Sequence, residues 1–440
     1  MQNTLQKFHS IFLYGFFFTL PWQTIWIIRE VFFAGEKWQY GTIGIYMSDA
    51  FLFAWMCSSI ILYSKKVTTF ISKNPHVIIA TILISCWGFI SILWADDRIL
   101  AVYFAIKLSC ALDIFILLQI IPTSFTKISI AIIANGLLQS LIGLHQFTTQ
   151  STFDNSFLGT QYHAISWGGT ATITVDHERW LRLYGAMPHP NIFGGLLIVT
   201  ILLSFYLYSN NTKKLFYQKL FLLFCIGLFT INIIMTFSRT AWITLSLCLI
   251  IFITYNYLRE KVFLYKNIAP FMVLFFSIFL MAVIFAPLFF TRITHDTAFT
   301  HNSFDDRKMY ITHAIILIKK YPLIGAGIGN YTNSIYRIDY MNPIWYYQPV
   351  HNTYLLLCAE LGMVGIILFV YFFSIICKTI YTRIQLLTTR DITILLIIFS
   401  ITFIALFDHW LWTSHFGLFT LFIFLGLLLK KAVPTNVTTA

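Results

Sequence analysis

Three residues at the edges of apolar stretches are the strongest candidates for chemistry in this sequence. Arg182 lies in the run RLYGAMPHPNIFGG, Arg239 in FSRTAW, and His351 in VHNTYLLLCAELG. Charged groups beside membrane-spanning segments are costly and are therefore candidates for function. Two permanent cations and one base that titrates near neutral pH favour chemistry on a lipid-linked substrate that carries phosphate.

Arg239 stands between two apolar stretches with almost no loop to separate them. A guanidinium group does not deprotonate in proteins, so in such a place it needs an anion. The alternative is an arginine that extends its side chain to the lipid headgroups. The neighbouring hydroxyls of Ser238 and Thr240 favour a binding site, because an arginine at the headgroups does not require a polar cluster.

Arg182 precedes the start of a predicted helix. The step from Pro190 to Asn191, followed by an apolar run, is a signal for a helix start. A helix N-terminus and an arginine together favour phosphate binding. The alternative is a loop arginine that pairs with Asp176 or Glu178.

His351 precedes Asn352 at the start of another apolar stretch. An imidazole changes its charge near neutral pH and is therefore suited to act as a general base. The alternative is an interfacial histidine that bonds to the backbone or to Glu360. Two arginines predicted at the same surface favour the general base. Asp408 and His409 lie near a turn at that surface and are candidates for orienting a catalytic group.

The sequence thus predicts His351 as the catalytic residue and the two arginines as anion ligands. The residues predicted to support them are Asn191, Ser238, Arg307, Asn352, Glu360, Asp408 and His409.

The composition indicates which elements must position these residues. The 440-residue chain is 58% hydrophobic and 10% charged, whereas a soluble domain is roughly 25% charged. Its 45 Phe, 23 Tyr and 12 Trp suit lipid-facing helices with aromatic belts. We therefore predict an all-α integral membrane protein in contact with membrane lipids. The net charge of +12 comes from basic residues scattered singly and in pairs between apolar stretches, so we predict no nucleic-acid partner.

A helix needs about 20 apolar residues to cross a bilayer. On this rule the sequence predicts about twelve transmembrane helices, at residues 10–28, 47–64, 77–95, 99–121, 126–147, 191–208, 216–236, 241–258, 267–290, 352–377, 391–407 and 409–429.

Twelve helices place both termini on one side of the membrane, which we predict to be the cytoplasm. The segments on that side carry the pairs Lys65–Lys66, Lys213–Lys214 and Lys430–Lys431, with only Glu260 and Asp391 as acids. An excess of Lys and Arg is the usual property of short cytoplasmic loops.

This topology places two long loops on the outer side. The predicted units are transmembrane helices 1–5 at residues 1–147, an outer loop at 148–190, helices 6–9 at 191–290, a large outer loop at 291–350, helices 10–12 at 351–430, and a cytoplasmic tail at 431–440.

The second outer loop contains the run RKMYITHAIILIKKYP, which ends at Pro322. Its apolar residues recur at helical spacing, which predicts an amphipathic helix on the outer leaflet, with an apolar face formed by Ile311, Ala314, Ile315 and Ile318. Pro322 is expected to end this helix, and a flexible return is expected at Gly325, Gly327 and Gly329.

The order and spacing of these runs resemble the O-antigen ligase family, which also contains O-antigen polymerases and protein O-oligosaccharyltransferases. The resemblance covers most of the chain and is strongest from Arg182 to Gly362. It rests on the RxxG-PN run, the SR-A step, the amphipathic helix with its Gly-rich return, and the HN-YL-ELG run. It implies a GT-C-like fold in the bacterial inner membrane, with both termini cytoplasmic and with the active site and both long loops facing the periplasm.

The resemblance also implies an activity. A glycan on undecaprenyl diphosphate would be transferred to a sugar hydroxyl of lipid A–core with inversion. Arg182 and Arg239 would bind the diphosphate, and His351 would deprotonate the acceptor hydroxyl, with no metal and no cofactor. Elementary chemistry agrees, because a diphosphate is a competent leaving group whose growing charge arginines neutralise. The sequence also lacks a CxxC or Cys/His spacing for a metal.

Three other functions remain open at this point. An O-antigen polymerase would use a second lipid-linked glycan as the acceptor. A transferase that modifies proteins is disfavoured, because the sequence ends soon after the last predicted helix. A transporter of lipid-linked glycans fits twelve helices, but its charged groups belong near the bilayer midplane on broken helices. Here the candidates gather at one surface.

Overall fold

Helices make up most of the chain, in agreement with the predicted all-α membrane fold. The computed structural model describes residues 2–33, 35–210, 215–261, 267–294 and 298–430. The predicted inner residues Lys213 and Lys214, and the predicted tail at 431–440, lie outside these ranges.

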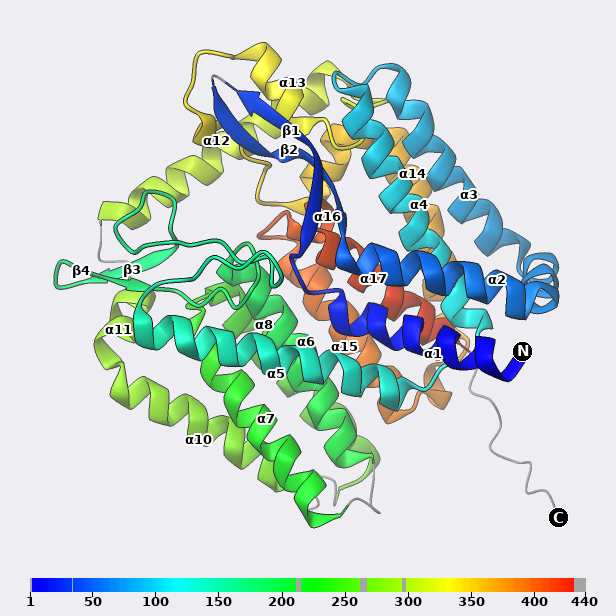
Figure 1. Ribbon diagram of the computed structural model, residues 1–440, viewed down its shortest axis with the longest axis horizontal. Helices are drawn as coiled ribbons and strands as arrows, with labels where there is room; N and C mark the ends of the chain where they lie inside the picture. Colours follow the sequence, from blue (N-terminus) through cyan, green and yellow to red (C-terminus); the bar gives the residue numbers. More distant parts are fainter. Residues whose placement is uncertain (1, 34, 211–214, 262–266, 295–297, 431–440) are drawn as a thin grey trace.

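The elements follow one another along the chain with two β-hairpins among the helices (Figure 1). Their bounds are α1 Gln2–Thr19, β1 Ile25–Phe33, β2 Glu36–Tyr46, α2 Met47–Lys73, α3 Pro75–Ile90, α4 Arg98–Ile120, α5 Phe125–Thr149, β3 Thr172–Val175, β4 Glu178–Leu181, α6 Pro190–Ser209, α7 Phe216–Met235, α8 Arg239–Arg259, α10 Ile268–Ile284, α11 Ala286–Thr294, α12 Ala298–Lys320, α13 Tyr331–Ile338, α14 Thr353–Tyr381, α15 Thr389–Ile404, α16 Trp410–Thr413 and α17 His415–Leu429.

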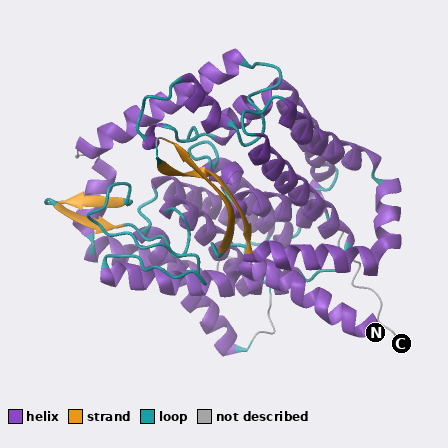
Figure 2. Cartoon of the chain, turned by 45° about the horizontal axis from the view of Figure 1, so that its top comes forward, coloured by secondary structure: helices purple, strands orange, loops and turns teal. Residues whose placement is uncertain are grey.

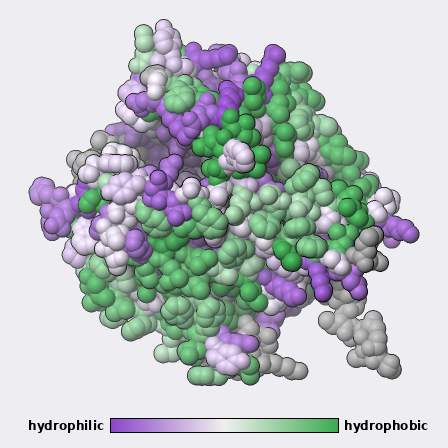
Figure 3. Space-filling view, in the orientation of Figure 1, coloured by the Kyte–Doolittle hydropathy of each residue, from purple (hydrophilic) through white to green (hydrophobic). Residues whose placement is uncertain are grey.

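Both hairpins and helices α12 and α13 lie at one end of the helical bundle, which we call the site face (Figure 1). The opposite end is the far face. Hydrophilic side chains gather around the hairpins and α12, whereas hydrophobic side chains cover much of the bundle below them (Figure 3). This distribution suits a bundle that is embedded in a membrane.

Eight helices in the described part of the chain are long and apolar enough to cross a membrane, or nine if α10 and α11 form one broken span. Helices α15 and α17, with 16 and 15 residues, are too short to meet the same criterion. The count of twelve spans therefore stays a prediction.

The predicted first span at 10–28 is wrong in its second half. Helix α1 ends at Thr19, shortly before Pro21, which lacks the N–H needed to continue a helix. Residues from Ile25 onward form strand β1, which pairs antiparallel with β2. An apolar run of this length suits a strand as well as a helix, so periodicity alone does not separate them. Figure 2 shows this hairpin lying along the helices.

The predicted span at 267–290 is also broken. Helix α10 ends at Ile284, and α11 leaves it at an angle of 91°. Pro287 follows directly after the bend; in a continuous helix its ring would clash with the carbonyl one turn earlier. The bend turns α11, with Arg292, toward the β3 strand on the site face.

Helix α14 is broken at Gly362, whose φ is +64°. Beyond the break, the amides of Met363 and Val364 donate to the carbonyls of Pro322 and Leu323, at 2.9 and 3.2 Å. The segment after α12 thus supplies the hydrogen bonds that the broken helix lacks.

The same segment also bonds to α14 on the other side of the break. The amides of Ala326 and Gly327 donate to the carbonyls of Ala359 and Glu360, at 2.8 and 2.9 Å. Gly325, Ala326 and Gly327 are all buried. The Gly-rich return is therefore a packed turn, and the predicted flexible one is wrong.

Replacing Gly362 by alanine is expected to lower the free energy of unfolding by at least about 2 kcal/mol, because an L-residue is strained at positive φ. A Cβ there would also lie 2.3 Å from the carbonyl oxygen of Leu323. The unfolding temperature in detergent measures the loss. Gly169→Ala is the control, since Gly169 has φ +81° but no atom within 4 Å of an added Cβ. Both variants share the strain of positive φ, so a greater loss at Gly362 measures the clash with Leu323. A loss well below about 2 kcal/mol in Gly362→Ala would contradict the prediction, and equal losses in the two variants would exclude a contribution from the clash.

Helix α12 ends at Lys320, before Pro322, as predicted. Its predicted apolar face is divided in the structure. Ala314 is fully buried, and α12 packs on α14. Ile311 and Ile315 are each 42% exposed. The helix is therefore a packed part of the site face as well as an amphipathic element.

Candidate active site

The break between α7 and α8 binds two arginines through backbone carbonyls. Arg182 Nε donates to the carbonyl of Thr236 at 2.7 Å, and Arg292 Nε donates to that of Phe237 at 2.8 Å. Carbonyls at a helix C-terminus lack partners within the helix and carry partial negative charge, so they favour cations. Each arginine is thereby held through Nε at the point where Arg239 begins α8.

Arg182 lies close to the start of α6, the helix start that the sequence predicted, and its side chain is buried. Its Nη2 donates to Asn191 Oδ1 at 2.9 Å. Its partners are thus Thr236 and Asn191 rather than Asp176 or Glu178. The residue before the helix, His189, accepts the amide of Asn191 on its Nδ1 at 3.1 Å. Burial, and then the charge of Arg182, lower the pKa of His189 to about 3, so this histidine is neutral and able to accept.

His351 faces Asp408 across a short gap. The distance from His351 Nδ1 to Asp408 Oδ1 is 3.9 Å, and that nitrogen is buried without a hydrogen bond. The rest of the ring lines a cavity, where Tyr310 lies 5.9 Å away between ring centroids. A distance of 3.9 Å is too long for a hydrogen bond. It suits a pair that closes when substrate binds, since catalytic hydrogen bonds are often long in free enzymes.

Asp408 also accepts two hydrogen bonds, from Asn191 Nδ2 to Oδ2 and from the amide of His409 to Oδ1, both at 2.8 Å. Burial raises the pKa of Asp408, but its interactions with His351 and His409 outweigh burial and hold the pKa well below its usual range. The carboxylate is therefore ionised, and a chain of polar contacts runs from Arg182 through Asn191 and Asp408 to His351.

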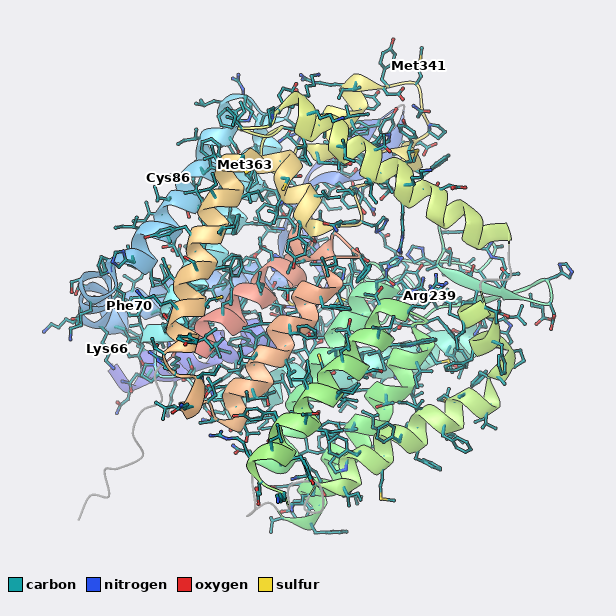
Figure 4. The ribbon with its side chains drawn as sticks, turned by 180° about the vertical axis from the view of Figure 1, so that it is seen from behind. Lys66, Phe70, Cys86, Arg239, Met341 and Met363 are labelled. Atoms are coloured by element: carbon teal, nitrogen blue, oxygen red, sulfur yellow. The ribbon has the colours of Figure 1, made fainter. Side chains whose placement is uncertain are left out.

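Five arginines line one cavity of about 670 Å³ on the site face, together with His351. They come from four parts of the chain and are Arg179, Arg182, Arg239, Arg292 and Arg307. Asp306 is the single acid among the described lining residues. Figure 4 places Arg239 beside the β3–β4 hairpin.

The arginines in the cavity crowd one another. Burial, and then the charges of Arg239 and Arg307, lower the pKa of Arg182 to about 10. The guanidinium stays charged at neutral pH, but repulsion between like charges disfavours the empty cavity. A ligand with several negative charges relieves this repulsion and accepts hydrogen bonds from the same groups.

The structure brings Arg182, Arg239 and His351 to one cavity, together with the predicted supporting residues Ser238 and Arg307. Asn191 lines the same cavity, and Asp408 adjoins it through His351.

Two other predicted supporting residues hold the fold together. Asn352 caps α14, with Oδ1 accepting the amide of Leu355 at 2.9 Å. Glu360 accepts from Trp412 Nε1 and from the amide of Gly329, both at 2.8 Å. It therefore joins α14 to α16 and to the Gly-rich turn, and its partners do not include His351.

Three residues of the site were not predicted from the sequence: Arg179, His189 and Arg292. Arg292 follows the run APLFF as Arg239 follows an apolar stretch. That shared position was a usable signal. Arg179 lies in the β4 strand of a hairpin that no pattern predicted, and its Nη2 and Nε donate to Thr172 of β3.

One group of side chains has the composition of a metal site, although the sequence predicted no metal. His351, Asp408 and His409 place ligand atoms within 4.8 Å of one another. His409 is a poor ligand, because Nδ1 bonds with Thr413 Oγ1 at 2.8 Å and Nε2 with Tyr40 hydroxyl at 3.4 Å. The burial of its ring lowers the pKa of His409 to about 4, which suits these neutral contacts. These contacts suit three side chains that hold one another in position better than they suit a metal centre.

Comparison with known families relates part of the chain to one of them. Residues 221–370 match the family model described as O-Antigen ligase. This segment contains Arg239, Arg292, Arg307 and His351, whereas Arg182 and Asp408 lie outside it. No curated protein matches the chain.

Proposed function

We propose that this member of the O-antigen ligase family transfers a glycan from undecaprenyl diphosphate to a sugar hydroxyl of lipid A–core. The family match already indicates a membrane glycosyltransferase of the O-antigen ligase or polymerase type. The donor, the acceptor, the periplasmic orientation of the site and the inverting, metal-independent reaction are the proposal. It rests on one observation, a cavity that is lined by five arginines and by His351, whose Nδ1 faces Asp408.

The arginines suit the leaving group of this reaction. When the bond between the anomeric carbon and the phosphate oxygen breaks, the diphosphate receives the electron pair and an additional negative charge. Guanidinium groups bind phosphate oxygens through paired hydrogen bonds. Arg182 and Arg292 are already fixed through Nε, so their orientation costs little at the moment of reaction.

His351 suits the activation of the acceptor. Its ring takes the proton from the acceptor hydroxyl while the oxygen attacks the anomeric carbon from the face opposite the diphosphate. The new bond to the acceptor oxygen forms as the bond to the phosphate oxygen breaks, and attack from the opposite face inverts the configuration. Asp408 lies on the Nδ1 side and stabilises the protonated ring. The proton then passes from His351 to water or to the departing diphosphate.

A gene deletion in the source strain tests the proposal. Lipopolysaccharide and the undecaprenyl-linked glycan are compared on gels, with and without complementation by the wild-type gene. We expect bare core in the deletion, with long polymer retained on the undecaprenyl carrier. Core capped by a single repeat unit would instead assign an O-antigen polymerase. Unchanged patterns of both glycans would contradict any role in this transfer.

A further inference from the structure

A second cavity lies at the far face of the bundle and has a strongly positive lining. Its volume is about 890 Å³, and its basic residues are Lys65, Lys66, Lys73, Arg383 and Lys430. No acidic residue is among the described residues that line it. Helix α14 begins two residues after His351 of the arginine cavity, and its last turns, with Thr379, line this second cavity, as does Leu429 at the end of α17. Figure 4 accordingly shows Lys66 and Phe70 on the side opposite Arg239.

The basic residues that line the cavity come from several elements. Lys65 and Lys73 belong to the last turns of α2, and Arg383 follows α14. Lys430 follows α17 and is fixed, since its Nζ donates at 2.6 Å to the Ile121 carbonyl and to Thr123 Oγ1. Cations from three separate helix ends thus converge on one space.

Apolar side chains complete the wall beside these cations. Phe70 and Val77 come from α2 and α3, and Leu429 is the last residue of α17. A lining with a cationic side and an apolar side matches an amphiphile that has an anionic head and hydrocarbon chains. A soluble anion would make no favourable contact with the apolar side.

A neighbouring cavity of about 740 Å³ extends the positive region. It shares Arg383 and Lys430 with the first and adds Arg259 and Arg390. Its one acid, Asp391, is occupied at the start of α15, where Oδ2 accepts from the amide and hydroxyl of Thr388 at 3.0 and 2.7 Å. Asp391 Oδ1 also lies 3.9 Å from Arg390 Nη1, and Arg390 and Arg259 donate to the backbone carbonyls of Leu427 and Leu387. The charges of this neighbouring cavity are therefore partly satisfied by the protein itself.

A general excess of basic residues on one face of a membrane protein explains why this face is positive, but it does not explain why five basic residues line the same cavity. Other lysines near the far ends of helices lie outside both cavities: Lys7, Lys127 and Lys219. Lys127 lies over the ring of Tyr14, and Lys219 over that of Tyr208. Lys66 likewise lies over the ring of Tyr63. The α2 lysines of the cavity, which are exposed, are thus distinct in lining one hollow that has no acid among its described residues.

We propose that the far-face cavity binds the headgroup of an anionic phospholipid from the surrounding bilayer. The phosphate lies among the cations of α2, Arg383 and Lys430, and an acyl chain follows the apolar wall at Phe70. Basic pockets between transmembrane helices are suited to such headgroups. This site lies at the opposite end of the bundle from the arginine cavity and does not depend on the proposed transferase function.

The test is lipid binding by the purified full-length protein in detergent, with native mass spectrometry and thermal unfolding as readouts. The probes are phosphatidylglycerol, cardiolipin, phosphatidylcholine and inorganic phosphate. We expect bound adducts and a raised unfolding temperature with the two anionic lipids only. Stabilisation by inorganic phosphate to the same extent would overturn a lipid site in favour of a soluble anion, and equal binding of phosphatidylcholine would remove the role of charge.

The variant K65Q/K66Q/K73Q should bind the anionic lipids about 10- to 100-fold more weakly, since each lysine near an anionic headgroup contributes attraction. The variant K7Q/K127Q/K219Q removes the same charge from outside the cavity and should bind as the wild type does. Arg383→Gln provides a second test if the triple variant unfolds. Equal binding by the cavity and control variants would overturn the site.

Discussion

Replacing His351 by alanine is expected to lower the rate of glycan transfer by about 10²- to 10⁴-fold, the usual contribution of a general base. The ring lines the arginine cavity and has Asp408 on its Nδ1 side, so no other described group holds the same position. Transfer is measured with purified protein, a lipid-linked glycan donor and a core acceptor. Binding of the donor should change little, because the arginines remain.

His177→Ala is the matched control, since His177 lies exposed in the turn between β3 and β4 on the same face. It should keep the wild-type rate. Asp408→Asn should also lower the rate of glycan transfer, but by less, because it removes the charge that stabilises the protonated ring of His351. If His351→Ala retains substantial activity while the protein stays in the membrane, His351 is not the base.

Replacing Arg239 by alanine is expected to lower transfer by at least about 10²- to 10³-fold, the usual effect of removing one hydrogen-bond donor that stabilises negative charge in a transition state. Arg239 opens α8 beside the carbonyls that hold Arg182 and Arg292, so its loss removes a central cation of the cavity. Both kcat and the affinity for the diphosphate-linked donor should fall, which steady-state kinetics with varied donor measures.

Arg98→Ala is the control for a change of charge on the site face. Arg98 is exposed at the start of α4 and donates to the carbonyl of Leu93. Arg239→Lys should recover only part of the activity, because an ammonium lacks the paired donors of a guanidinium. Full activity of Arg239→Ala would exclude Arg239 from diphosphate binding.

The sequence predicted that Arg182, Arg239 and His351 lie at one surface, because each belongs to a run that joins a loop to an apolar stretch. Such junctions fall at a membrane surface, and counting spans places them on one side. The position of Arg292 required the bend between α10 and α11, which a hydropathy average does not resolve. Pro287 was the available signal, but an apolar run on both sides of it concealed the bend.

Side-chain roles proved harder to assign than positions. Glu360 lies near His351 in the chain, yet its carboxylate points to Trp412 and the Gly-rich turn. The partner that faces His351 is Asp408, which comes from the turn after α15. The sequence predicted Asp408 as a candidate for orienting a catalytic group, but helical spacing within one segment does not reveal that Asp408, rather than Glu360, faces His351. The β1–β2 hairpin was missed for a different reason, since apolar residues suit both strand and helix.

Asp408 and His409 lie between two short helices, α15 and α17. With 16 and 15 residues these helices extend about 24 and 22 Å, whereas the hydrocarbon core of a bilayer is about 30 Å thick. Every residue of α17 is buried, and α15 packs on α6, α8 and α17, so protein rather than lipid surrounds most of this short pair. Hydrophobic mismatch acts on surfaces that face lipid. The position of Asp408 beside His351 should therefore change little with the acyl-chain length of the surrounding bilayer.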